Sequence, residues 1–396
     1  MKKCALFFIL LLSLAIVFSS ALPGVSETAG DDAARLICLN IGKADCMLLL
    51  YQDEAYLIDT GYEQNWNALK TMLEQYDITH LNGVFLTHCH DDHEGGLALL
   101  AQSDIAVDAW YAARIYYGVA ASSHPTVIAA SIRNEAVAWL DAGDTIPVGS
   151  DGSFTVLGPI SVNTDNENNN SLVMRFSCAQ GSILFAGDMK EDEEYDLLFN
   201  NVFSSCDVLK VGHHGDNKAT GKKMLKIVQP KAAVILTNSE EEPDTPAVST
   251  LSRLDNIGCA AYVSQDFSDA LMVTLKKGET PQVTDVIWSG VPERAENISL
   301  SIDVTQDTLT IFNQGTEPFS LNGCLVYSTK GNELLAMPDA VVEAGGKYVL
   351  GTKVTTVDMD VKISKKRIWN KSSLDRAVLY DAYGRVLSCT DNGLPE

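Results

Sequence analysis

Proline is scarce in this sequence, with 12 among 396 residues. Apolar residues make up 46% of the chain and charged residues 20%. These proportions exclude a disordered, a collagen-like or a coiled-coil protein and are typical of globular domains. The length allows two or three such domains.

Basic side chains are also few: 29 lysines and arginines stand against 52 aspartates and glutamates, which gives a net charge of −23. Such an acidic surface repels nucleic acids and acidic membranes at long range. Any substrate that carries phosphate must therefore be attracted locally, for instance by bound metal ions.

Long apolar runs are confined to the N-terminus. Lys2 and Lys3 precede an apolar segment that continues to Phe18, and the small residues Ser19-Ser20-Ala21 follow it. This order is typical of a secretory signal peptide, which we predict over residues 1–26; an uncleaved membrane anchor is the alternative. We expect a secreted or cell-surface protein with no membrane span after cleavage of the signal.

The nine cysteines show no paired spacing such as CxxC, so the sequence offers no zinc knuckle. Export would permit disulfides. Cys324 and Cys389 are a candidate pair because both fall in the C-terminal part of the chain. For the other six cysteines after Cys4, buried free thiols are at least as plausible as disulfides.

Two sequence patterns divide the chain. Between residues 33 and 280, short strand-like runs alternate with helical patterns such as Trp66–Tyr76, which predicts an α/β domain. Residues 281–296 read as a linker. From 297 to 392, apolar and polar residues alternate with a period of two, which predicts a small all-β sandwich.

The strongest chemical signal is the segment from His88 to His93, which directly follows the predicted buried strand Gly83–Thr87. His88 and His90 are two residues apart, so in extended backbone both rings point to one side and can hold one metal ion. Asp92 and His93 can reach a second ion nearby. A polar loop with chance histidines is the alternative, but three of the chain's seven histidines stand here.

Two later segments place reactive groups in the same way. Gly187-Asp188 follows the predicted strand Ser182–Ala186, and His213-His214 follows the predicted strand Val208–Val211. Each segment would deliver its side chains at the end of a strand, and a glycine before Asp188 would let the backbone approach closely.

These three segments together resemble the metallo-β-lactamase superfamily, whose members carry an HxHxDH motif, a later Gly-Asp and a further His. The nearest likeness within it is the hydrolase domain of the DNA-uptake protein ComEC and its secreted relatives. Four segments carry that likeness: Leu39–Asp45, Leu57–Gly61, Asn169–Val173 and Leu209–Gly215. The resemblance implies an αββα sandwich with two divalent metal ions, usually zinc and in some members manganese.

The resemblance also implies a role for individual side chains. A metal-bound hydroxide would attack the substrate, with Asp92 and Asp188 as the catalytic carboxylates. Asp59, Asn170 and His214 would support the ligands or contact the substrate. Six residues are implied as ligands: His88 and His90 for the first ion, Asp92, His93 and His213 for the second, and Asp188 as the bridge.

The sequence departs from the superfamily at three places. Asn168–Ser171 stands where many members supply another histidine to the first ion, and amide oxygens are poor zinc ligands. Thr245 stands where related domains have the histidine of a Gly-His-Pro, and Asp216 replaces a common serine. We therefore expect a weak or water-completed first site.

The C-terminal part resembles a lamin-tail domain, an immunoglobulin-like β sandwich that bacteria often append to secreted hydrolases. The matching segments are Leu309–Gly315, Phe319–Cys324 and Ala377–Gly384. The resemblance implies contact with the cell surface through this domain.

The sequence therefore predicts an exported protein with an αββα sandwich followed by a small all-β, immunoglobulin-like sandwich. Its predicted activity is metal-dependent hydrolysis of phosphodiesters, in nucleic acid or in a phosphorylated surface polymer. The alternatives are a non-catalytic, metal-containing surface-binding protein and a lactam or lactone hydrolase.

Overall fold

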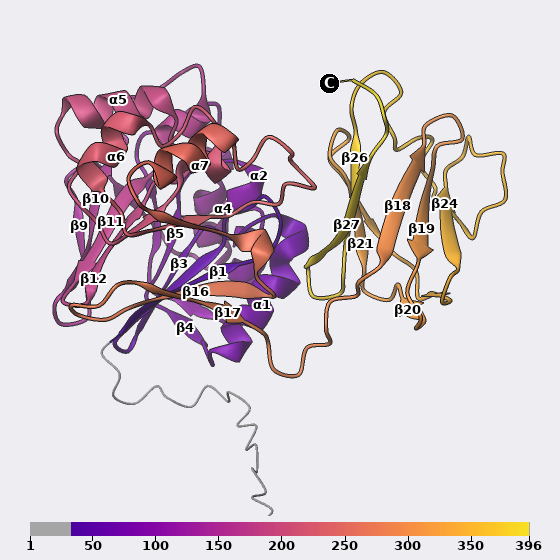
Figure 1. Cartoon of the computed structure of the whole chain (residues 1–396), viewed down its shortest axis with the longest axis horizontal. Coiled ribbons are helices and arrows are strands. Elements are labelled where there is room, and N and C mark those ends of the chain that lie inside the picture. Colours follow the sequence, from indigo (N-terminus) through magenta and orange to yellow (C-terminus); the bar gives the residue numbers. More distant parts are fainter. Residues whose placement is uncertain (1–32, 396) are drawn as a thin grey trace, which may run out of the picture. The chain divides into compact units, whose positions relative to one another are not determined.

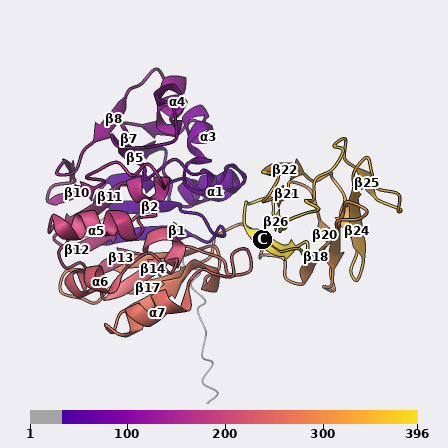
Figure 2. The same cartoon turned by 90° about the horizontal axis from the view of Figure 1, so that it is seen from above.

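The computed structural model describes residues 33–395, so the predicted signal peptide lies outside the described residues. In the first part of the described chain, two β-sheets face each other and helices cover their outer sides (Figures 1 and 2). This αββα arrangement, followed by a C-terminal region built mostly of strands, confirms the predicted fold class.

The first sheet has the strand order β17-β16-β1-β2-β3-β5-β7-β8. Helices α1, α3 and α4 cover its outer face, and β4 and β6 form a separate pair. The bounds of these elements are β1 (Ala34–Leu39), β2 (Met47–Tyr51), β3 (Glu54–Ile58), α1 (Trp66–Gln75), β4 (His80–Leu81), β5 (Gly83–Leu86), α2 (Asp91–Glu94), α3 (Leu97–Gln102), β6 (Ala106–Val107), β7 (Trp110–Ala113), α4 (Pro125–Ile132), β8 (Val137–Leu140), β16 (Ala270–Leu275) and β17 (Gln282–Val286).

The second sheet has the strand order β15-β14-β13-β12-β11-β10-β9, with helices α5, α6 and α7 packed on its outer face. Strands β12, β13, β14 and β15 run parallel to one another. The bounds are β9 (Thr145–Val148), β10 (Gly152–Gly158), β11 (Val173–Cys178), β12 (Gly181–Phe185), α5 (Glu191–Phe199), β13 (Val208–Lys210), α6 (Lys222–Val228), β14 (Ala232–Ile235), α7 (Val248–Asp255) and β15 (Ala260–Val263).

Burial on both faces explains the nearly continuous apolar runs of the central strands. In β1, Leu36 and Cys38 belong to the core between the sheets, whereas Ile37 belongs to the core beneath the helices. Between the sheets, Phe85 of the first packs against Phe154 of the second, with ring centroids 4.8 Å apart. Strands covered on both faces need apolar side chains at every position.

The C-terminal region has two four-stranded sheets, with orders β18-β19-β24-β25 and β22-β21-β26-β27, and the pair β20-β23. Its core includes Leu309, Ile311, Val326 and Leu379. The exact domain limits and the lamin-tail likeness stay predictions. The bounds are β18 (Ile298–Asp303), β19 (Thr308–Asn313), β20 (Phe319–Ser320), β21 (Leu325–Ser328), β22 (Glu333–Ala336), β23 (Val341–Val342), β24 (Lys347–Gly351), β25 (Val361–Lys362), β26 (Arg376–Tyr380) and β27 (Val386–Asp391).

Two further predictions concern cysteines and membrane spans. The eight cysteines from Cys38 to Cys389 are free thiols, so the candidate disulfide between Cys324 and Cys389 is not formed. Among residues 33–395, no helix combines the length and the apolar character that crossing a bilayer requires.

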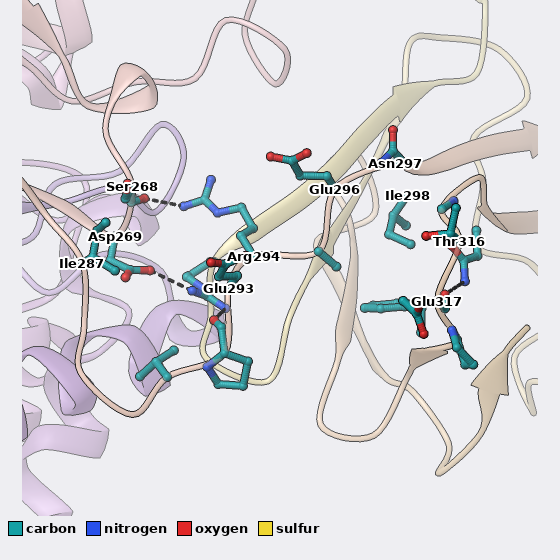
Figure 3. Close-up of a pocket in the computed structure, with 18 of the residues that line it drawn as sticks. Ser268, Asp269, Ile287, Glu293, Arg294, Glu296, Asn297, Ile298, Thr316 and Glu317 are labelled. Atoms are coloured by element: carbon teal, nitrogen blue, oxygen red, sulfur yellow. Dashed lines mark hydrogen bonds and ion pairs between the residues drawn. The ribbon is translucent and has the colours of Figure 1, made fainter. Parts of the chain in front are cut away.

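A buried arginine of the C-terminal region binds residues of the first part of the chain. Arg385 is 6% exposed and donates to Asp269 Oδ1 at 2.8 Å, to Asp381 Oδ2 at 2.7 Å and to the Pro292 carbonyl at 3.0 Å. Nearby, Arg294 donates to the Ser268 carbonyl, beside a cavity of about 910 Å³ (Figure 3). The guanidinium therefore neutralises two carboxylates that little water reaches.

Replacing Arg385 by methionine should destabilise the protein by about 3–5 kcal/mol, because Asp269 and Asp381 would remain buried without a counter-charge. Urea unfolding followed by circular dichroism measures this loss. Arg114→Met is the matched control, because Arg114 pairs with Asp141 at 2.8 Å while both are more than half exposed. The control should lose less than about 1 kcal/mol; equal losses would contradict this account of Arg385.

Candidate metal centre

The candidate site lies where strands of both sheets end. In the first sheet, β5 ends two residues before His88 and leads into α2. In the second sheet, the parallel neighbours β12 and β13 end shortly before Asp188 and before His213-His214. The fold thereby brings together three segments that are far apart in the sequence.

Glycine is required at the strand end that carries Asp188. Gly187 has φ +50°, and a Cβ at this position would lie 2.9 Å from the Cβ of Ser171. The Asp188 amide donates to the hydroxyl of the same serine at 2.9 Å. A larger residue than glycine would therefore displace the backbone that aims Asp188 into the site.

Four side chains form a compact group of potential metal ligands: Asp92, His93, Asp188 and His214. Nε2 of His214 lies 3.3 Å from Asp92 Oδ2 and 3.4 Å from Asp188 Oδ2. Nε2 of His93 lies 3.4 Å from Asp188 Oδ2 and 3.9 Å from Asp92 Oδ1. Ligand atoms about 2.0–2.1 Å from a tetrahedral zinc ion lie about 3.3–3.4 Å from one another. Three of the four spacings therefore fit such an ion, and the fourth, 3.9 Å, is wider.

In both histidines of this group, a hydrogen bond from Nδ1 fixes the orientation of the ring. His93 Nδ1 donates to Asp59 Oδ2 at 2.8 Å, and Asp59 also accepts bonds from the amide and the hydroxyl of Thr87, each at 2.8 Å. His214 Nδ1 donates to the Leu236 carbonyl at 2.8 Å. These bonds leave Nε2 of each ring as the atom that faces the group.

Several buried atoms of the group have no hydrogen-bond partner in the part of the chain that the structure describes. They include Nε2 of His93, Nε2 of His214 and Oδ1 of Asp188. A buried polar atom without a partner costs about 1–3 kcal/mol. A divalent cation bound by these atoms would remove that cost, so the donor set fits a metal ion.

The charges of the group depend on one another. Burial lowers the pKa of His214, but the carboxylates of Asp188, Asp92 and Asp45 together outweigh this effect and raise the pKa to about 9. Burial also lowers the pKa of His93, yet Asp188 and Asp92 hold it well above its usual value. Burial raises the pKa of Asp188, but His214 and His93 hold it well below the usual range. In the absence of a metal ion, protonated imidazoles would therefore balance the negative charge of the carboxylates.

Behind this group lies a second buried charge pair. The ammonium of Lys210 contacts Asp45 Oδ2 and donates to the Gly187 carbonyl at 3.3 Å. Asp45 Oδ1 is 3.4 Å from Nδ1 of His214. Sequence analysis missed this pair, although a lysine within the apolar strand β13 was a visible signal. Asp45, Asp59 and His93 also form a close group. Because Asp45 contacts Lys210 and Asp59 binds His93 Nδ1, these carboxylates position the histidines and are not themselves assigned as metal ligands.

The other predicted ligands approach Asp188 from further positions. His88 Nε2 lies 3.9 Å from Asp188 Oδ2 and 2.9 Å from Nδ1 of His90. His213 Nε2 lies 3.7 Å from the same Asp188 oxygen. The structure therefore brings all six predicted ligands to one place, with Asp188 shared among them.

The two adjacent histidines differ from their predicted roles. Sequence analysis assigned His213 to the second ion and His214 to a supporting position, but it is His214 that joins the compact group of four. His213 is partly exposed, and its Nε2 lies 3.1 Å from the amide nitrogen of Asn168. Both histidines have positive φ, 45° and 51°, a strained conformation that turns the two rings in different directions.

Asn170 serves the adjacent loop. Its amide donates to the Asn163 carbonyl at 2.9 Å and to Glu167 Oε2 at 2.8 Å, and its oxygen accepts from the Asn163 amide at 2.7 Å. These bonds use the groups that would otherwise contact substrate. Asn168, in the segment that stands where many superfamily members have a histidine, is the asparagine that contacts a histidine of the site.

The C-terminal region contacts the rim of the site. Asn332 donates to Oδ2 of Asp91, the neighbour of Asp92, at 3.4 Å. The rings of Tyr62 and Tyr327 lie 6.0 Å apart. A change in these contacts would therefore alter the surroundings of Asp92.

Comparison with known proteins agrees with this geometry. The sequence profile of the metallo-beta-lactamase superfamily matches residues 39–239. The chain belongs to this superfamily. Its members are generally metal-dependent hydrolases, and the matched segment contains every predicted ligand.

Two curated relatives each align with about half of the chain. ComE operon protein 3 of Bacillus subtilis (strain 168) is 27% identical over an alignment of 240 residues that covers 54% of this chain and 30% of that protein. Recombination protein 2 of Haemophilus influenzae is 26% identical over 221 residues, 54% of this chain and 26% of that protein. The chain thus spans less than a third of the length of these curated relatives.

Similar solved structures include the metallo-beta-lactamase fold protein YhfI from Bacillus subtilis, at 12% identity and a TM-score of 0.41, covering 62% of this chain and 100% of that one. The diiron β-hydroxylase CmlA from Streptomyces venezuelae has 11% identity and a TM-score of 0.41, covering 65% of this chain and 55% of that one.

The two adjacent histidines should differ in their effect on metal content. His214→Ala should lose the ion at the compact group, because one of four buried ligands disappears, whereas His213→Ala should retain it. Metal analysis by mass spectrometry after dialysis against a competing chelator measures this difference. Retention by His214→Ala together with loss by His213→Ala would contradict the assignment.

Proposed function

We propose that this superfamily member is an exported, zinc-dependent phosphodiesterase that cleaves nucleic acid, with manganese as the alternative metal. The observation that carries the proposal is the close group formed by Asp92, His93, Asp188 and His214, in which three of the four spacings fit one tetrahedral cation. His88 and His90 would hold a second cation, with Asp188 between the two. Bound cations would supply Lewis-acid stabilisation of the phosphoryl oxygens and would activate water.

The residues of the chain would do the remaining work. Asp92 is the most accessible member of the group, with 16% of its side chain exposed against 2% for Asp188. Although burial raises it, the neighbouring imidazoles hold the pKa of Asp92 below its usual value, so the carboxylate is ionised. Asp92 can therefore accept a hydrogen bond from a water at the open side of the site and orient it.

Two lysines near the site favour an anionic substrate. The positive charges of Lys190 and Lys43 act on His213 at the open edge. Each is only loosely paired, Lys190 with Asp216 at 3.9 Å and Lys43 with Glu242 at 3.8 Å. Phosphate oxygens could replace these carboxylates as partners, whereas a neutral lactam would not use them.

Two further observations support nucleic acid and export. One relative is named Recombination protein 2, a name that refers to a process of nucleic acids. The N-terminal order of Lys2, Lys3 and an apolar run favours export. The proposal also keeps the lamin-tail likeness of the C-terminal sandwich, which would hold the enzyme at the cell surface.

The test compares hydrolysis of bis-p-nitrophenyl phosphate, single-stranded DNA and nitrocefin by the purified protein. Asp188→Asn should reduce phosphodiester hydrolysis by about 1000-fold, because metal stabilisation is worth several kcal/mol and 1.4 kcal/mol corresponds to a factor of ten. Asp255→Asn, a change to an exposed carboxylate on α7, is the matched control and should keep full activity.

Two outcomes would contradict the proposal. Hydrolysis of nitrocefin without hydrolysis of either phosphodiester would identify a lactam hydrolase. No hydrolysis of any substrate by a protein with its metal ions bound would identify a metal-containing binding protein.

A further inference from the structure

Positive charge is concentrated in two short parts of this acidic chain, residues 217–238 and residues 361–374. Residues 217–238 contain five lysines and no aspartate or glutamate, although the whole chain carries a net charge of −23. Lys231 is paired with Asp207 at 2.8 Å. The other four, Lys218, Lys222, Lys223 and Lys226, are exposed, and we call them the lysine strip.

The lysine strip is available to a ligand. Within residues 33–395, no carboxylate oxygen lies within 4.0 Å of its four ammonium groups, whereas Lys190 and Lys231 have such partners. The buried face of α6 consists of Met224, Leu225 and Val228, so the lysines of this helix project from its other side. Four unpaired cations on an acidic protein repel one another unless an anion binds there.

Three lysines of the strip, Lys218, Lys222 and Lys223, line a groove of about 330 Å³ between α5 and α6, which lie side by side (Figures 1 and 2). Tyr195 of α5 lines the same groove, and its side chain is 57% exposed. The ammonium of Lys223 lies 5.2 Å from the centre of this ring. An aromatic ring among cations is the arrangement that proteins use to stack a nucleobase while they hold its phosphates.

Two carboxylates also line the groove, and only Glu191 is exposed to solvent there. Glu194 is 7% exposed and accepts the Gly221 amide at 2.7 Å, so it belongs to the framework. Glu191 is exposed at the start of α5. Arg253 donates to the carbonyls of Asn217, Ala219 and Thr220 and thereby fixes the loop that carries Lys218.

The lysine strip begins next to the metal centre. Lys218 follows His214 by four residues, so their Cα atoms lie at most about 14 Å apart. Asp216 connects the two places: one of its oxygens accepts the Lys218 amide at 2.6 Å, and the other lies 3.5 Å from Nδ1 of His213. A polyanion bound at the metal centre can therefore reach the groove within a few phosphates.

We propose that the lysine strip and Tyr195 bind a single-stranded nucleic acid beside the cleavage site, with phosphates on the lysines and one base on the ring. This inference rests on the proposed phosphodiesterase function and names its substrate. It also explains how a chain with a net charge of −23 can hold a polyanion. The stacking ring favours nucleic acid over a surface polymer that contains phosphate but no bases.

Binding of a fluorescein-labelled 20-residue oligothymidylate, measured by anisotropy in EDTA, tests the inference without any cleavage. Lys222→Gln/Lys223→Gln should weaken binding about tenfold at 0.1 M salt, and the slope of log K against log salt should fall in magnitude by about 1.4, or 0.7 for each lost phosphate contact. Lys347→Gln/Lys353→Gln makes the same charge change on exposed lysines of the C-terminal region and should leave both values unchanged.

Tyr195→Leu should weaken binding of the oligothymidylate but not of an abasic oligomer of equal length. Equal affinities for wild type and the strip variant, or equal losses in the strip and control variants, would overturn the inference. A strip variant that loses affinity for poly(glycerol phosphate) but not for the oligothymidylate would also overturn it. Because binding is measured without metal, an inactive wild-type enzyme would refute the proposed function and leave this result readable.

Discussion

The site depends on a carboxylate that water hardly reaches. Asp188 has 2% of its side chain exposed, and its Oδ2 lies within 3.9 Å of ring nitrogens of His88, His93, His213 and His214. An isolated charge at such a position would cost several kcal/mol. The strand ends of two sheets therefore have to bring compensating groups to this one oxygen, and divalent cations are the compensation that the donor set fits.

The groups that contact the ligand histidines also carry buried charges that are neutralised by partners. Asp59 holds His93, and Asp45 lies behind His214 with the ammonium of Lys210 in contact. These groups fix which ring nitrogen faces the centre, and Lys210 limits the total negative charge. The same physical rule recurs at Arg385, which neutralises two carboxylates away from the site. The buried carboxylates of the site, and those that Arg385 binds, are thus accompanied by a cation or an imidazole.

The sequence predicted well those features that follow from local patterns. The helix predicted at Trp66–Tyr76 is observed as α1, because its apolar residues recur at helical spacing. The segments that carry the site follow strands that were predicted. The distinction between His213 and His214 could not be predicted, since it depends on two successive backbone conformations with positive φ. The partner of Lys210 could not be predicted either, because 165 positions separate it from Asp45 and only the packing of the two sheets brings them together.

Anomalous diffraction from crystals of the zinc-loaded protein tests the central claim most directly. The account predicts a zinc peak about 2.0–2.2 Å from Nε2 of His93, Nε2 of His214 and carboxylate oxygens of Asp92 and Asp188. The absence of zinc from this position, or a zinc ion bound by His213 in place of His214, would contradict it.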